Sequence, residues 1–178
     1  MSVKNEAQGR LDGITDELIA LSQRIHDNPE LGYEEEKASG WLTEMLDGAG
    51  FKVERGICEL PTAFKATIGS GPLHIAICAE YDALPGIGHA CGHNVIAASS
   101  VGAAIAAAAV ADDVGLTISV IGTPAEEVLK AGGKILLLER GAFDGMHAAM
   151  MAHPAPWDVA MWPIVAASFF EAHYTGKA

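Results

Sequence analysis

One stretch near the middle of the 178-residue chain constrains the fold more than any other. The seven residues LHIAICA, from Leu73 to Ala79, are nearly continuous in apolar character. A strand that faces water on one side alternates apolar and polar side chains, whereas a strand covered on both faces is apolar throughout. This stretch therefore predicts a strand that is buried in the interior of a sheet.

The segments that follow have the rhythm of an α/β fold. The apolar, alanine-rich run from Val95 to Ala111 predicts a buried helix, and LTISVIG, from Leu116 to Gly122, predicts a second strand. A helix is expected near Lys134–Arg140 and a third strand over Ala148–Ala152. This alternation is typical of parallel strands joined by helices. The sequence therefore predicts an α/β fold with an open, mostly parallel sheet and helices on both faces.

Elements are also expected on either side of this core. Earlier in the chain they are amphipathic helices over Ile14–Asp27 and Glu34–Leu46 and strands over Phe51–Cys58 and Ala63–Ile68. The last stretch, IVAASFFEAHYTGKA, begins another strand that is hard to place in the same sheet. We therefore expect residues 1–163 to form one unit and residues 164–178 to begin another.

Charge and cysteine content exclude several classes of protein. Acidic residues outnumber basic ones by 23 to 11, which gives a formal net charge of −12. Such a chain repels phosphate backbones and anionic membranes, so we expect neither nucleic acid nor membrane as a partner. The N-terminus lacks the apolar segment of a signal peptide. Because the three cysteines (Cys58, Cys78 and Cys91) are odd in number and far apart, we expect no disulfide framework and a reducing cytoplasm.

Polar side chains follow the predicted strands at the points where the strands end. Asp82 comes just after the first strand, Glu126 and Glu127 follow the second, and His153 follows the third. In open α/β sheets, ligands bind at the carboxyl ends of the strands. We therefore expect these four side chains to share one pocket.

The block HACGHN leads into the predicted helix at the same edge. Residues two apart share a face in extended backbone but not in a helix, so Cys91 and His93 can converge only outside the helix. Gly92 allows a tight turn between them, and Asn94 is expected to be the N-cap. The positive end of the helix is expected to lower the pKa of the Cys91 thiol.

The adjacent glutamates Glu126 and Glu127 suit metal-assisted hydrolysis. Neighbouring side chains diverge, so one carboxylate can bind a metal ion while the other faces a water as general base. The pattern alone leaves open which residue has which role. The two carboxylates can also supply the negative charge that a cation near a positive helix end requires.

The remaining candidates have weaker signals. Asp82 is expected to support the site rather than bind metal directly, and His89 suits a supporting role and a simple turn equally well. Cys78 is expected to be a core residue. His147 precedes His153 by six extended residues, or roughly 20 Å, so the two cannot share an ion.

Four motifs in this order, AEYDALPGIGHACGHN, GTPAEE, GGKILLLERGAFDG and MMAHP, resemble the amidohydrolase branch of the peptidase M20 family, the aminoacylase- and carboxypeptidase-like metallopeptidases. The resemblance runs from about Leu18 to the end of the chain. With asparagine at position 94, the block HACGHN resembles the form found in the dipeptidase-like sub-branch. It implies an amide hydrolase that acts on small peptides or N-acyl amino acids with two divalent ions, Zn²⁺ or Mn²⁺.

The same resemblance implies a role for each site residue. It assigns metal binding to Cys91, His93, Glu127 and His153. Glu126 is then the general base, and Asp82 supports the site.

The resemblance also implies that the chain is an N-terminal piece of a longer enzyme. Residues 1–163 correspond to the N-terminal part of the catalytic domain, and residues 164–178 to the first strand of a lid domain through which full-length relatives form homodimers. The family's lid histidine and last metal ligand would lie beyond this chain, so we expect the chain alone to be inactive or nearly so.

Two other classes stay open. A cysteine hydrolase would use Cys91 as its nucleophile and would need a histidine base, for which His93 is poorly placed only two residues away. It would also leave the paired glutamates without a role. A fragment that binds metal without catalysing a reaction is the other alternative.

Overall fold

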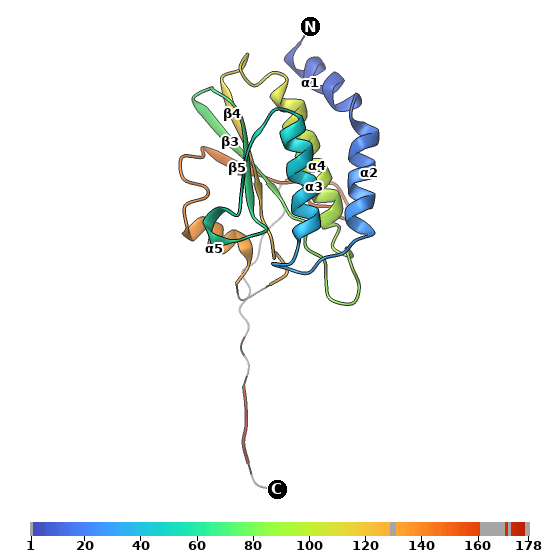
Figure 1. Cartoon of the computed structure of the whole chain (residues 1–178), viewed down its shortest axis with the longest axis vertical. Helices are drawn as coiled ribbons and strands as arrows, with labels where there is room; N and C mark the ends of the chain where they lie inside the picture. Colours follow the sequence, from blue (N-terminus) through green and yellow to red (C-terminus); the bar gives the residue numbers. More distant parts are fainter. Residues whose placement is uncertain (1, 129–130, 161–169, 171, 177–178) are drawn as a thin grey trace.

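The computed structural model describes residues 2–128, 131–160, 170 and 172–176 (Figure 1). The elements are α1 (Val3–Asp12), α2 (Thr15–His26), α3 (Glu36–Gly48), β1 (Lys52–Arg55), the short 3₁₀ helix η1 (Ile57–Glu59), β2 (Phe64–Gly69), β3 (Leu73–Ala79), α4 (His93–Ala108), β4 (Leu116–Gly122), α5 (Gly133–Glu139) and β5 (Ala148–Met150). Among the described residues, no helix combines the length and the apolar character needed to cross a membrane.

The five strands form one sheet in the order β1-β2-β4-β3-β5. β3 pairs in parallel with β4 on one side and with β5 on the other. β2 is antiparallel to both β1 and β4, so it is the one strand of the five that runs against the others. The predicted mostly parallel sheet is therefore confirmed, with β3 in its interior.

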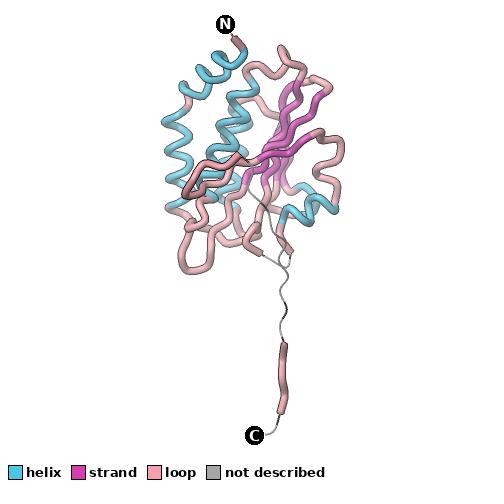
Figure 2. Tube along the Cα trace, turned by 180° about the vertical axis from the view of Figure 1, so that it is seen from behind, coloured by secondary structure: helices cyan, strands magenta, loops and turns pink. Residues whose placement is uncertain are grey.

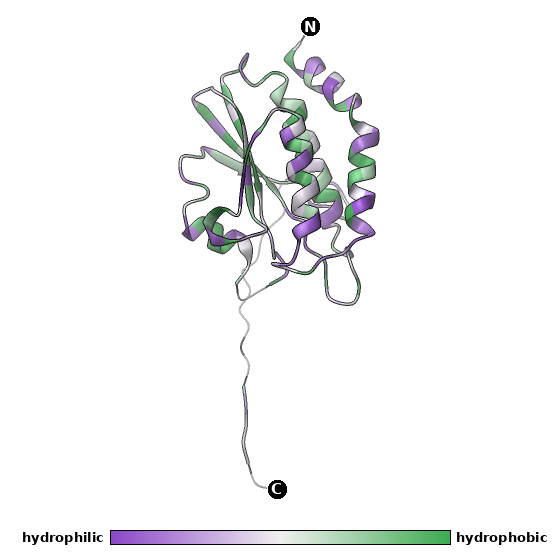
Figure 3. Cartoon of the chain, viewed as in Figure 1, coloured by the Kyte–Doolittle hydropathy of each residue, from purple (hydrophilic) through white to green (hydrophobic). Residues whose placement is uncertain are grey.

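Helices cover both faces of this sheet (Figures 1 and 2). On one face, Ala97, Val101 and Ala104 of α4 belong to the same core cluster as Ile77 of β3 and Val120 of β4. Helices α1, α2 and α3 all contact α4 on this side. Alanine side chains let α4 lie close to the strands, and Figure 3 shows α4 as largely apolar while α1 is mostly hydrophilic.

The opposite face carries a smaller core beneath α5. Leu137 of α5 packs there with Ala76 of β3 and Ile121 of β4. Because Ala76 and Ile77 point to opposite faces of β3 and both are buried, the apolar run that predicted this strand is explained by cover on both sides.

The start of α4, its N-cap residue and the end of the first strand differ from the sequence-based expectation. α4 begins at His93 because Gly92, with a left-handed φ of +83°, is its N-cap. The prediction that Asn94 caps this helix is therefore wrong, and the Asn94 amide instead donates a hydrogen bond to Ser22 Oγ at 3.0 Å. The first strand ends at Arg55, before the predicted Cys58, because Gly56 turns the chain with a φ of +67°.

The predicted strand in residues 164–178 cannot be compared with the structure over most of its length. Residues 164–169, 171, 177 and 178 lie outside the described residues, and residues 170 and 172–176 have no assigned secondary structure. The strand and the boundary after residue 163 therefore stay predictions.

Candidate metal centre

The six predicted site residues gather at the carboxyl edge of the parallel strands. Asp82 follows β3, Glu126 and Glu127 follow β4, and His153 follows β5, while Cys91 and His93 stand at the start of α4. The Nε2 atom of His93 lies 3.7 Å from Glu126 Oε2 and 4.0 Å from Glu127 Oε1. The structure thus brings together the residues that the sequence placed at the ends of three different strands.

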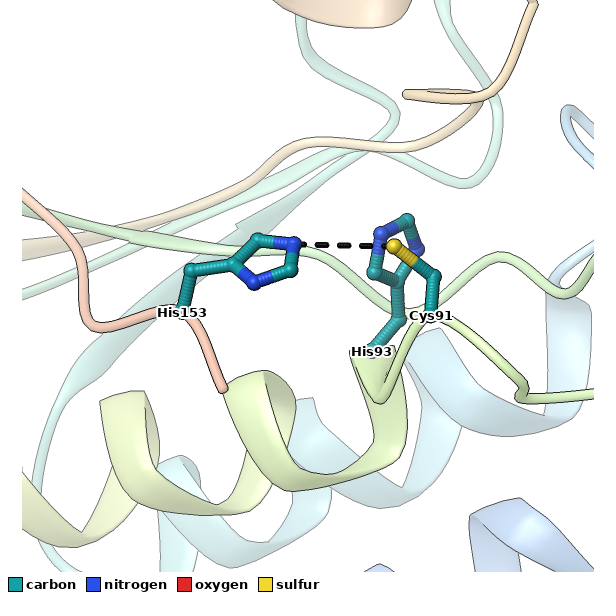
Figure 4. A group of neighbouring side chains, drawn as sticks. All are labelled: Cys91, His93 and His153. Carbon is teal, nitrogen blue, oxygen red and sulfur yellow. Dashed lines mark hydrogen bonds between the residues drawn. The ribbon is translucent and has the colours of Figure 1, made fainter. Parts of the chain in front are cut away.

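Cys91, His93 and His153 form one group of possible metal ligands (Figure 4). One donor atom from each residue lies within 4.8 Å of the others, and Cys91 Sγ is 3.5 Å from His153 Nε2. The His153 Nδ1 atom is 2.7 Å from the carbonyl oxygen of Pro154, so it donates there and leaves Nε2 facing Cys91. A Cβ on Gly92 would lie only 3.0 Å from the Pro154 ring, so glycine permits this close approach.

Glu80, His93 and Glu126 form a second group. The Oε2 atom of Glu80 lies 3.4 Å from His93 Nε2, and its other oxygen accepts a hydrogen bond from the Lys134 ammonium. Glu80 and Lys134 were both missed by the sequence analysis. The available signal was a glutamate directly after the apolar β3 run, at the edge where Asp82 was recognised.

Asp82 orients His93 without belonging to either group. Its Oδ1 atom and its backbone oxygen each lie 2.9 Å from His93 Nδ1, so Nδ1 is the protonated nitrogen and Nε2 faces the other groups. Burial by itself would raise the pKa of Asp82, but hydrogen bonds from His93 and from the Glu127 backbone hold it below its ordinary value. Asp82 is therefore a carboxylate in the folded chain, in a supporting position.

The same contact acts on His93. Burial by itself would lower its pKa, but the hydrogen bond and charge of Asp82, together with the charges of Glu80 and Glu126, raise it. The imidazole therefore sits in a strongly negative environment.

The pKa of the Cys91 thiol contradicts the expectation of a lowered value. Burial, followed by a hydrogen bond and charge from Glu127 and the charges of Glu126 and Glu80, raises this pKa to about 12. The carboxylates that face the sulfur outweigh the partial positive charge of the helix end. These surroundings favour the neutral thiol of Cys91 over the thiolate.

Burial, followed by the charge of Glu80, also raises the pKa of Glu126. The Lys134 and His93 charges act in the opposite direction but do not cancel this effect. The Glu126 side chain is 37% exposed, so a water or a substrate can reach it.

The donor set fits a divalent cation. Among the described residues, the buried atoms His93 Nε2 and Glu80 Oε2 have no hydrogen-bond partner, although they lie side by side. Buried polar atoms without a partner are costly, and a cation bound by both atoms would remove that cost. Thiolate, imidazole and carboxylate are the ligands that proteins use for zinc. Since one nitrogen binds one ion, His93 Nε2 can serve only one of the two groups at a time.

Three further residues considered in the sequence, His89, His147 and Cys78, lie outside both ligand groups. His89 is buried with neither ring nitrogen partnered among the described residues, and it belongs to neither ligand group. His147 lies beside His74, whose backbone N–H donates to His147 Nδ1 at 3.0 Å. Among the described residues it shares no ligand group with His153, as predicted. Cys78 is buried in β3, as predicted for a core residue.

Comparison with known proteins identifies relatives along almost the whole chain. No protein-family model matches. The chain is 40% identical to the Xaa-Arg dipeptidase of Mus musculus over 191 aligned positions, which cover 99% of this chain and 44% of that protein. It is 34% identical to a p-aminobenzoyl-glutamate hydrolase chain of Escherichia coli, over 75% of this chain and 31% of that protein.

A solved structure supports the same relationship. A dinuclear metal-binding peptidase of the M20 family from Bacillus subtilis matches with a TM-score of 0.68 and 27% identity, over 82% of this chain and 44% of that chain. The chain therefore spans less than half the length of each of these relatives.

Proposed function

Because the chain belongs to the M20 family of metallopeptidases, we propose that it carries the metal-binding and general-base residues of an enzyme that hydrolyses amide bonds in dipeptides or N-acyl amino acids. The observation that carries this proposal is the buried, unpartnered Nε2 atom of His93 among carboxylates and a thiol. The relatives are named as a dipeptidase and as a hydrolase of aminobenzoyl-glutamate, which supports this class of substrate.

The site residues would have two different roles, metal binding and proton transfer. Cys91, His93, Glu127 and His153 would hold two divalent ions, and such ions polarise a carbonyl group and acidify a nearby water. Glu126 would be the general base, which accepts a proton from the attacking water and passes it to the leaving amine. Its raised pKa and partial exposure suit a group that must both accept and release a proton.

The roles of the two glutamates can be separated by measuring metal affinity and turnover independently. In a longer form of the protein, Glu126→Gln should lose hydrolysis of dipeptides that end in arginine, because it removes the proton-transfer group. It should keep the Zn²⁺ that Cys91, His93, Glu127 and His153 are proposed to hold. Glu127→Gln should lose Zn²⁺ affinity first. A Glu127→Gln variant that binds Zn²⁺ as tightly as the wild type would contradict its role as a ligand.

A cysteine hydrolase is the second candidate, because Cys91 Sγ and His153 Nε2 lie within hydrogen-bond reach of each other at 3.5 Å. The raised pKa of the thiol opposes this function, since a nucleophilic cysteine must be a thiolate. Treatment of a longer, active form of the protein with a chelator decides between the two candidates. Turnover that survives metal removal but is abolished by alkylation of Cys91 would establish the cysteine mechanism.

The finer properties follow from the same residues. The thiol and imidazoles favour Zn²⁺, whereas the carboxylates accept Zn²⁺ or Mn²⁺, and elemental analysis of the purified protein distinguishes them. All three cysteines are free, which suits a reducing cytoplasm. Residues 164–178 would begin the lid domain through which a longer form of the protein dimerises, which light scattering of that form would test.

A further inference from the structure

Glu35, in the loop before α3, is a fully buried carboxyl group outside both ligand groups. Its Oε1 atom accepts a hydrogen bond from the backbone N–H of Ala125 at 2.7 Å, and its Oε2 atom accepts one from Thr62 Oγ1 at 2.9 Å. Burying a carboxyl group is costly, so a residue in this place needs a specific reason to be polar. The contact with Ala125 supplies that reason.

Ala125 directly precedes the two site glutamates and has an unusual backbone conformation. Its φ of +56° lies in the left-handed region that residues with a side chain disfavour. The turn at Ala125 aims Glu126 and Glu127 back toward His93. A strained conformation of this kind persists only where its surroundings hold it, and the hydrogen bond to Glu35 is such a restraint.

The loop around Glu35 packs tightly against this turn. A Cβ on Gly32 would lie 2.9 Å from Ala125 Cβ and 2.8 Å from a methyl group of Val128. The Tyr33 hydroxyl donates a hydrogen bond to the carbonyl oxygen of Ala131, on the far side of the turn. Glycine at position 32 therefore lets the loop contact the segment that carries Glu126.

The same loop also holds the strand end that carries Asp82. The carbonyl oxygen of Glu30 accepts a hydrogen bond from the backbone N–H of Ala83 at 2.8 Å, next to Asp82. One loop thus contacts both segments whose side chains face His93.

We infer that Glu35 is a positioning residue of the metal centre: its buried carboxyl group holds the left-handed turn at Ala125 and thereby sets where Glu126 and Glu127 lie relative to His93. The inference rests on the proposed function, since it needs a metal ion at the site. Glu35 acts through the backbone of Ala125 and not by touching the ion.

Titration of the 178-residue chain with Co²⁺ tests this role, because the visible absorption of bound Co²⁺ reports its ligands and geometry independently of catalysis. Glu35→Ala should weaken Co²⁺ binding by about 10- to 100-fold and change the spectrum. Glu35→Gln should keep the wild-type Co²⁺ affinity and spectrum. Its amide oxygen can still accept a hydrogen bond from the Ala125 N–H, and its NH₂ group can donate one to Thr62. Glu34→Ala, which removes an exposed neighbouring carboxylate, is the matched control and should leave both unchanged.

Ala125→Gly provides an independent arm. Glycine adopts a positive φ without strain, so the turn then depends less on Glu35. Glu35→Ala should consequently weaken Co²⁺ binding less in the Ala125→Gly background than in the wild type. If Glu35→Ala does not fold, as judged by circular dichroism, Glu35→Asp replaces it, because its carboxyl group is one methylene too short to reach the Ala125 amide.

The outcomes separate the inference from the proposed function. A wild-type chain that binds no Co²⁺ overturns the metal centre and the role of Glu35 with it. A wild-type chain that binds Co²⁺, beside a folded Glu35→Ala or Glu35→Asp variant with the same affinity and spectrum, overturns the inference alone. The inference is also overturned if Glu35→Gln weakens Co²⁺ binding as strongly as Glu35→Ala does. The hydrogen bond to Ala125 that glutamine keeps would then have no effect on the site.

Discussion

The carboxylate of Asp82 lies 2.9 Å from His93 Nδ1 through one oxygen and accepts a hydrogen bond from the Glu127 backbone N–H at 3.0 Å through the other. It therefore connects the start of α4 to the turn after β4. Because Nδ1 donates to Asp82, the His93 Nε2 lone pair is directed at the ligand groups. The geometry of both segments depends on one buried side chain.

Asp82→Asn should weaken Zn²⁺ binding by about 10- to 100-fold. Asparagine has one acceptor oxygen, so its NH₂ group must face an N–H donor of either His93 or Glu127. Calorimetric titration against a competing chelator measures the affinity. Asp113→Asn, an exposed change in the connection between α4 and β4, is the control. Equal affinity of Asp82→Asn and wild type would show that this carboxylate does not support the site.

The sequence predicted the location of this site because the information was local. The apolar run of β3 identified a strand covered on both faces, which is typical of parallel sheets. The carboxyl ends of parallel strands lie at the same edge of the sheet. The polar residues after each strand, Asp82, Glu126 and His153, could therefore be placed together without knowing any contact. What was predictable was a set of positions along the chain.

The errors arose where distant parts of the chain decide the outcome. Glu80 was missed because its partner, Lys134, is 54 residues away, and a single glutamate beside an apolar run has no pattern. The predicted pKa shift of Cys91 was wrong because it considered the helix end and not the carboxylates brought there by β3 and β4. Helix α1 was missed because it has no buried residue, so no apolar periodicity marks it.

Cys91→Asp should change the metal preference of the site. A thiolate is a soft ligand that favours Zn²⁺ over Mn²⁺, whereas a carboxylate suits both ions. We therefore expect the ratio of Zn²⁺ to Mn²⁺ affinity to fall in this variant. Parallel titrations with the two ions measure the ratio. Glu34→Asp, at an exposed position outside both ligand groups, serves as a control. An unchanged ratio would exclude Cys91 as a ligand.

Gly122→Ala should destabilise the fold by about 1–3 kcal/mol through overpacking. A Cβ at this position, the last residue of β4, would lie 2.2 Å from Cε1 of the buried Phe64 ring. A rigid aromatic ring cannot yield without moving β2. Gly40→Ala is the matched change, because nothing lies within 4 Å of its added Cβ inside α3.

Gly40→Ala should in fact stabilise the chain, by about 0.5–1 kcal/mol, because alanine is the better helix former. Urea unfolding of the two variants and the wild type gives both free energies. Destabilisation by both changes to the same degree would contradict the role of Phe64.

Glu35 should make the stability of the chain depend on pH. Burial raises its pKa above the ordinary value of 4.5, although its hydrogen bonds act in the opposite direction. The folded state then holds the proton more tightly than the unfolded state. Below the unfolded pKa both states are protonated and the full contribution to stability is present. As the pH rises through the folded pKa, that contribution is lost.

Glutamine cannot ionise, so Glu35→Gln should remove this pH dependence. The difference in free energy of unfolding between Glu35→Gln and the wild type should be constant below the ordinary glutamate pKa. As the pH rises to 7, the variant should become more stable relative to the wild type. Urea unfolding across this range measures it, with Glu34→Gln as the exposed control. A difference that stays constant up to neutral pH would mean that Glu35 keeps its ordinary pKa, because only a raised pKa makes the wild type lose stability relative to a residue without charge.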